Sequence, residues 1–135
     1  MFQLSKKVEY ALIAIRHMAA HANGQICTTK EVAEKYHLSY ELLAKVMQRL
    51  SKEKFIASYQ GVYGGYTLAK NPHSLTVSSV INAIEGKSML PIVQCEAESP
   101  DNCGIFETCT IKHPLVKLQG NINKVFEEMT IMEMV

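Results

Sequence analysis

Apolar residues recur at steps of three and four along the first part of the chain, in the pattern of amphipathic helices. Residues 5–22 predict a first helix of this kind. The segment TTKEVAEKYH predicts a second, short one, because Thr28 and Glu31 have the spacing of a capping box. A longer apolar pattern follows Ser39, an expected N-cap, and its basic residues fall on the outward side. A short helix, a tight connection and a longer basic helix predict a helix-turn-helix unit.

The pattern then changes to that of two short strands, FIASYQ and YTLAK, joined by GVYGG. Gly61, Gly64 and Gly65 permit the positive φ angles that a hairpin loop demands. A glycine-rich hairpin directly after a helix-turn-helix unit predicts a winged helix. The glycines are not followed by the lysine of a phosphate-binding loop, so we interpret them as part of a wing.

Two further helices are expected in the second half of the chain. Thr76 caps the segment TVSSVINAIEG, and Gly86 ends it. A last helix opens at His113–Pro114, where proline suits the first turn. The predicted fold is mainly α with a small β-hairpin wing, a winged helix-turn-helix plus a long C-terminal dimerisation helix. The expected parts are a winged helix-turn-helix DNA-binding domain over 1–86, a cysteine-rich cluster loop over 87–111 and a dimerisation helix over 112–135.

The last helix carries apolar residues spaced three, four, three and four apart, which is the spacing of a heptad seam. Such a seam could pack back on its own domain. We favour a homodimer contact, since helix-turn-helix proteins that read DNA usually act as two-fold pairs. The predicted dimer-interface residues are Leu115, Leu118, Ile122, Val125 and Met129.

Charge is distributed unevenly along the 135 residues. Residues 1–70 hold ten Lys and Arg against five Asp and Glu, whereas residues 71–135 hold four against eight. This asymmetry favours a first half that faces a polyanion such as double-stranded DNA, although two solvated surfaces of opposite sign would look the same. Charged residues interrupt the apolar start, and no run approaches a membrane span, so a cytoplasmic protein without a membrane partner is expected.

The helix after Ser39 is expected to lie in the major groove with its N-terminal residues nearest the bases. Lys45 and Lys52 most simply meet phosphates. Arg49 could meet a phosphate or read a guanine edge, and we favour the phosphate because Arg49 lies far from the N-terminal end. The predicted DNA-binding residues are Thr28, Ser39, Tyr40, Lys45, Gln48, Arg49, Lys52, Gln60 and Tyr63.

Three of the four cysteines, Cys95, Cys103 and Cys109, lie in one polar stretch with the spacing C-x7-C-x5-C. Zinc sites usually contain closer C-x2–4-C pairs, and disulfides are rare in the cytoplasm. Three spread thiolates favour an iron–sulfur cluster of the 2Fe–2S or 4Fe–4S type. His113 and Glu9 are candidate fourth ligands, and an exogenous ligand is the alternative. The remaining cysteine is interpreted as a small buried residue.

The segments LSKKVEYAL, TTKEVAEKYHLSYELLAKVMQRLSKEKFI, GVYGGYTLAK and TVSSVINAIEG, followed by the three-cysteine stretch, stand in the order found in a known family. The chain resembles the IscR/NsrR-type winged-helix regulators of the Rrf2 family over nearly its whole length. By this resemblance Cys95, Cys103 and Cys109 match the cluster cysteines. Glu9 falls where some nitric-oxide sensors of the family use an acidic ligand from the partner subunit. Gln60 replaces the arginine that is usual in the family's wing.

The resemblance implies a homodimeric, cytoplasmic DNA-binding transcriptional regulator, expected to be a repressor, that senses iron–sulfur cluster status, iron, nitric oxide or redox state. No catalytic set of side chains can be argued from the sequence, so an enzyme is not expected. Two alternatives remain open. One is a cluster-free winged-helix regulator that depends on thiols or zinc. The other is a winged-helix protein-interaction module that does not bind DNA.

Overall fold

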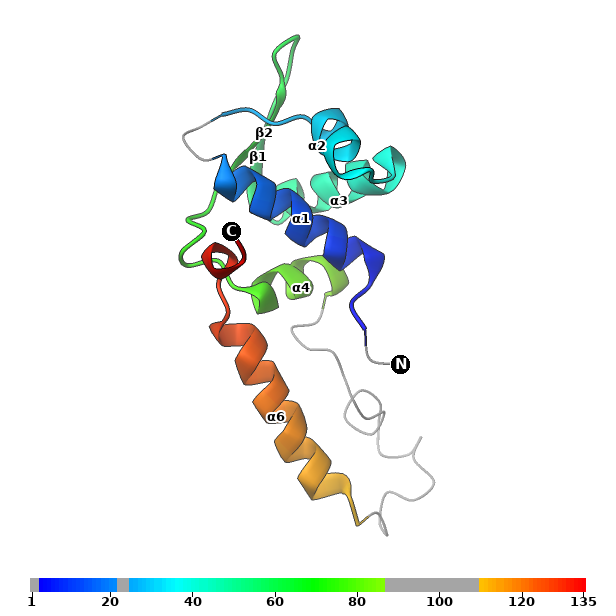
Figure 1. The fold of residues 1–135 in the computed structure, drawn as a ribbon, viewed down its shortest axis with the longest axis vertical. Coiled ribbons are helices and arrows are strands. Elements are labelled where there is room, and N and C mark those ends of the chain that lie inside the picture. Colours follow the sequence, from blue (N-terminus) through cyan, green and yellow to red (C-terminus); the bar gives the residue numbers. More distant parts are fainter. Residues whose placement is uncertain (1–2, 22–24, 87–109) are drawn as a thin grey trace.

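The computed structural model describes residues 3–21, 25–86 and 110–135. Helices form most of this structure, and one two-stranded hairpin projects from it (Figure 1). The predicted fold class is confirmed, with a winged helix-turn-helix and a long helix near the C-terminus. The elements are α1 (Lys6–Ala20), α2 (Thr29–Tyr36), α3 (Tyr40–Lys52), β1 (Ile56–Tyr59), β2 (Gly65–Leu68), α4 (Val77–Glu85), α6 (Lys112–Glu128) and the 3-10 helix η2 (Ile131–Met134).

Helix α1 lies at the centre, between α3 on one side and α4 on the other (Figure 1). Its side chains Val8 and Ile15 are fully buried, and they pack with Leu43 and Met47 of α3 and Ile81 of α4. Burial of a side chain of this size typically stabilises a fold by about 1.5–3 kcal/mol. The shared core therefore fixes the direction of α3, the predicted recognition helix, relative to α1.

Local signals in the sequence fix where the helices begin and end. Thr28 and Glu31 form the predicted capping box, with the Thr28 hydroxyl accepting from the Glu31 amide at 3.1 Å. Ser39 and Thr76 cap α3 and α4 as predicted. Gly86 ends α4 in the left-handed conformation, with φ of 75°.

The hairpin of β1 and β2 is antiparallel, with Ile56 opposite Leu68 and Tyr59 opposite Gly65. The chain before α2 extends this sheet by a short bridge that the sequence did not predict. Cys27 and Tyr66 exchange two backbone hydrogen bonds, each of 2.8 Å. The base of the wing is thus tied to the segment that leads into the helix-turn-helix.

The C-terminal segment differs from the single helix expected over 112–135. Helix α6 ends at Glu128, and the chain then returns to the core of the winged helix. Ile131 is fully buried, and its amide donates to the Leu75 carbonyl at 2.8 Å. The reason is local, because Thr130 and Glu133 form a capping box that begins a new 3-10 turn. Figure 1 shows only the C-terminal end of α6 beside α4, with the rest extending away.

Candidate nucleic-acid interface

Three hydrogen bonds fix the turn between α2 and α3 and the start of α3. His37 adopts a left-handed conformation with φ of 56°, and the Leu38 amide donates to the Ala33 carbonyl at 2.9 Å. The Ser39 hydroxyl accepts from the Leu42 amide, and the Ser39 amide donates to the Tyr10 hydroxyl at 3.1 Å. The last contact reaches across from α1 and was not predicted, because nothing in the local pattern signals it. It fixes the end of α3 that would face bases.

The outer side of α3 carries the polar residues expected to contact DNA. Lys45, Gln48 and Lys52 are exposed, and Tyr40 at the N-terminal end is 56% exposed. Ser39 is exposed at the same end, and Thr28 is exposed at the N-terminus of α2. The role of these side chains as DNA contacts stays a prediction, and all of them are open to solvent. A duplex could therefore meet them without any change in the fold.

The tip of the wing is open to solvent. Tyr63 is 90% exposed and Val62 is 95% exposed, and Gln60 lies beside them. The turn depends on glycine, since a Cβ at Gly64 would lie 2.4 Å from the Tyr59 carbonyl oxygen. This tight turn projects the tip away from the helices (Figure 1), where it could contact a neighbouring part of a duplex.

Arg49 is directed to the flank of α3 that faces α4. Its Nε donates to the Ala83 carbonyl at 2.9 Å, and its Nη2 lies 3.5 Å from Glu53. Ala83 belongs to the last turn of α4, where carbonyl groups have no partner within the helix. The guanidinium therefore ties α3 to α4, a contact that the periodicity of α3 alone could not reveal.

Cys95, Cys103 and Cys109 lie outside the described residues. Both candidate fourth ligands lie within the described residues, and the side chains of both are accessible to solvent. Glu9 is in α1, where its carboxylate is 3.1 Å from Lys6, and His113 is exposed in the first turn of α6. Within the described residues, no group of three or more His, Cys, Asp or Glu side chains is placed to hold a metal ion.

The donor chemistry still fits an iron–sulfur cluster, because the chain offers three thiols together with a carboxylate or an imidazole. Cys27 does not belong to that set. It is buried beside the wing, and burial, followed by the negative charge of Glu31, raises the pKa of its thiol to about 11. A thiol with so high a pKa stays protonated at neutral pH and is a poor metal ligand. This agrees with the interpretation of Cys27 as a small buried residue.

The predicted dimer helix presents an apolar stripe. Leu118, Val125 and Met129 are 47%, 64% and 37% exposed, whereas Leu115 and Ile122 are half-buried. The stripe is therefore partly open to solvent. None of the described helices is long and apolar enough to cross a membrane.

The helix-turn-helix, the exposed hairpin and the long C-terminal helix define a winged helix-turn-helix transcriptional regulator. A family model described as Rrf2, iron-dependent transcriptional regulator, matches residues 4–135. The chain belongs to the Rrf2 family.

Relatives and solved structures agree with this assignment. The chain is 30% identical over 132 residues to the HTH-type transcriptional regulator NsrR of Oceanobacillus iheyensis, covering 98% of this chain and 88% of the relative. It resembles the structure of T. potens IscR with a TM-score of 0.76 and 25% identity, covering 98% of this chain and 85% of that one. CymR, the global cysteine regulator of B. subtilis, shares the fold with a TM-score of 0.79 at 22% identity, covering 99% and 96%. These matches confirm the resemblance stated from the sequence and the predicted role as a DNA-binding transcriptional regulator.

Proposed function

We propose that this protein is a cytoplasmic, homodimeric repressor that binds an operator through α3 and the wing, and that it holds an iron–sulfur cluster on Cys95, Cys103 and Cys109. The observation that supports DNA binding is the exposed basic side of α3. Lys45, Gln48 and Lys52 are exposed on α3, and the two lysines would supply the positive charge of this side.

The proposed binding mode places the N-terminal end of α3 in the major groove. Ser39 and Tyr40 would lie nearest the bases, and Lys45 and Lys52 would contact phosphates. The tip of the wing, with Tyr63, would reach the adjacent backbone. Arg49 would act mainly by holding α3 against α4, since its Nε is already bonded to the Ala83 carbonyl.

The dimer would form through the apolar stripe of α6. The exposed stripe residues Leu118 and Val125 are one heptad apart, as a helix pair requires. A two-fold pair would place two recognition helices about 34 Å apart, one turn of duplex. The domain division into a DNA-binding part, a cluster loop and a dimerisation helix follows from this arrangement, with residues 129–135 packed on the DNA-binding part.

The cysteines would hold the cluster, which when bound supplies iron that reacts with oxidants and nitric oxide. Glu9 and His113 are the competing proposals for its fourth ligand. Glu9 has a direct structural link to the recognition helix, because the next residue is Tyr10 and the Tyr10 hydroxyl accepts from the Ser39 amide. A shift of the first turns of α1 would therefore move the N-cap of α3 and change its fit to DNA.

Anaerobic purification with iron and acid-labile sulfide assays tests the cluster. The wild-type protein should be brown, Cys103→Ala should be bleached, and Cys27→Ala should keep its colour, because Cys27 is buried beside the wing and is not one of the proposed ligands. A colourless protein with stoichiometric zinc would overturn the cluster and favour the zinc-dependent alternative. A spectrum that changes with Glu9→Ala but not with His113→Ala would assign the fourth ligand to Glu9.

Affinity for duplex DNA, measured across a salt series, tests the binding mode. Lys45→Ala and Lys52→Ala should each weaken binding to all sequences and lower the salt slope by about one. Unchanged affinity and slope in both variants would show that this side of α3 does not face DNA.

A further inference from the structure

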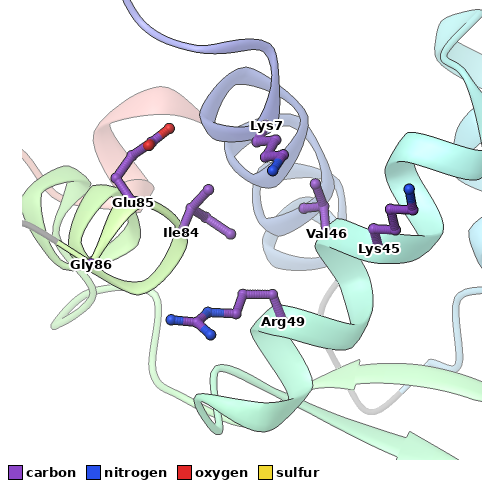
Figure 2. A pocket seen from close by; sticks show the side chains of 7 residues that line it. All are labelled: Lys7, Lys45, Val46, Arg49, Ile84, Glu85 and Gly86. Carbon is purple, nitrogen blue, oxygen red and sulfur yellow. The ribbon is translucent and has the colours of Figure 1, made fainter.

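Three cationic side chains from two helices line one pocket beside the recognition helix (Figure 2). The pocket has a volume of about 320 Å³ and lies between α1, α3 and the end of α4. Lys7 comes from α1, and Lys45 and Arg49 lie one turn apart on α3. Val46 and Ile84 supply its apolar lining. The lining thus combines positive charge with apolar surface.

The positive charge of the pocket is only partly compensated. Lys7 and Lys45 make no ion pair with any of the described residues. Among the described lining residues Glu85 is the one carboxylate, and it accepts a hydrogen bond from the Ser5 hydroxyl. Figure 2 shows the Glu85 carboxylate directed away from the Arg49 guanidinium. An anion in the pocket would offset the mutual repulsion of the three cations.

The Arg49 guanidinium is held in a fixed position at this site. Its Nε donates to the Ala83 carbonyl at 2.9 Å and its Nη2 lies 3.5 Å from the Glu53 carboxylate, so part of the donor capacity of the planar guanidinium is left for a ligand. Arginine in a fixed orientation binds phosphate oxygens well, and lysine adds charge through a flexible stem. The volume lies at the small end of the range of about 300–1,000 Å³ for ligand sites, which suits a small anion.

We propose that the pocket between α1, α3 and α4 binds a phosphate group through Lys7, Lys45 and Arg49, an assignment that rests on the DNA-binding function proposed above. The phosphate has two chemical sources, the backbone of bound DNA or a free phosphorylated molecule. The position of the pocket favours the backbone. A helix with its side chains is about 10–12 Å across and fills a major groove about 12 Å wide, so its flanks meet phosphates.

Binding of inorganic phosphate to the full-length protein tests the site itself. Amide NMR signals of Lys7, Lys45 and Ile84 should shift and saturate as phosphate replaces chloride at constant ionic strength. Lys7→Ala should weaken this binding about tenfold, the loss expected for one charged contact. Lys6→Ala is the matched control and should bind as the wild type does, because Lys6 pairs with Glu9 and does not line the pocket.

Affinity for duplex DNA across a salt series separates the two sources. If the backbone fills the pocket, Lys7→Ala lowers the salt slope by about one and Lys6→Ala leaves it unchanged. If a free phosphorylated molecule fills the pocket, Lys7→Ala weakens the binding of inorganic phosphate about tenfold and keeps the wild-type salt slope for duplex DNA. A wild-type protein that binds phosphate here but no duplex would overturn the DNA-binding function and leave the pocket as a site for a free ligand. Equal phosphate binding by wild type and Lys7→Ala, or equal shifts with chloride alone, would overturn the site.

Discussion

At the scale of single residues, Tyr10 joins the first helix to the start of the recognition helix. Its hydroxyl accepts from the Ser39 amide at 3.1 Å, while the Ser39 hydroxyl caps α3. Ser39 therefore has two roles: its hydroxyl caps the start of α3, and its amide links that start to α1. The orientation of α3 relative to α1 depends on the Tyr10 hydroxyl as well as on the apolar core.

Tyr10→Phe should weaken DNA binding more than it weakens folding. The Ser39 amide is near solvent, so water can replace the hydroxyl, and the loss in free energy of unfolding should be at most about 1 kcal/mol. Duplex affinity should fall several-fold, because the N-terminal end of α3 gains freedom. Tyr66→Phe, half-buried against the core at the base of the hairpin and not among the predicted DNA-binding residues, is the control for urea unfolding and duplex binding. Equal affinity of wild type and Tyr10→Phe would refute the positioning role.

His17 is a second residue whose surroundings decide its chemistry. It is buried in α1, with its Nδ1 2.9 Å from the Tyr36 hydroxyl and its ring 4.3 Å from that of His21. Burial lowers the pKa of His17 below its ordinary value of 6.5, and the nearby charges of His21 and Lys35 lower it further, against a smaller opposing effect of Glu31. The folded state therefore favours the neutral imidazole.

The free energy of unfolding should decrease as pH falls below 6.5. In that range the unfolded chain takes up a proton on His17 before the folded chain does, so the stabilisation is complete above 6.5 and is lost toward the lower folded pKa. Urea unfolding at about pH 7.5 and about pH 5.5 measures the loss. His17→Gln keeps a partner for Tyr36 and should reduce the pH dependence. His73→Gln, in an exposed loop, should retain it, and an unchanged dependence in His17→Gln would contradict the prediction.

At the scale of elements, backbone conformation and not free space decides what a glycine contributes. Gly120 in α6 and Gly61 in the wing both have nothing within 4 Å of an added Cβ. Gly120 lies inside a helix, where alanine is favoured, whereas Gly61 has φ of 107°, which side chains disfavour. The same substitution should therefore have opposite effects at the two positions.

Gly120→Ala should raise the free energy of unfolding by about 0.5–1 kcal/mol, because it removes backbone freedom from the unfolded chain. Gly61→Ala should lower the free energy of unfolding by about 1–2 kcal/mol, because the alanine would have to adopt the positive φ angle that the turn requires. Urea unfolding followed by circular dichroism compares the two variants with the wild type. Destabilisation by Gly120→Ala would mean that another surface packs closely against that side of α6.

Helices, hairpin and caps could be predicted from the sequence because each depends on neighbours a few residues away, as with Thr28 and Glu31 in their capping box. Contacts between distant segments could not. The bridge of Cys27 to Tyr66 and the hydrogen bond of Ile131 to Leu75 form only when the helices have packed, although the capping box of Thr130 and Glu133 marks locally where the last turn begins. The candidate site divides in the same way. The exposed face of α3 followed from periodicity, whereas the bonds of Tyr10 and Arg49 depend on tertiary structure.

At the scale of the whole molecule, charge and apolar surface are separated along the chain. The basic half forms the winged helix, with Lys45 and Lys52 on the outer side of α3. The other half contributes α6, which extends away from that unit (Figure 1) and carries the apolar stripe. An exposed apolar stripe at a distance from α3 suits a regulator in which one helix pairs two copies and the other reads DNA.

The stripe of α6 gives a direct test of assembly. Val125 is 64% exposed in the single chain, so Val125→Glu should leave the folding of the monomer nearly unchanged. In a dimer the new carboxylate would be buried without a partner, which costs several kcal/mol and should shift the protein to monomer. Lys117→Glu introduces a carboxylate on the same helix outside the stripe and should stay dimeric. Light scattering measures the mass, and duplex binding should weaken with it, because a monomer engages only one half-site. A dimeric Val125→Glu, or a monomeric wild type, would show that α6 does not join the two copies.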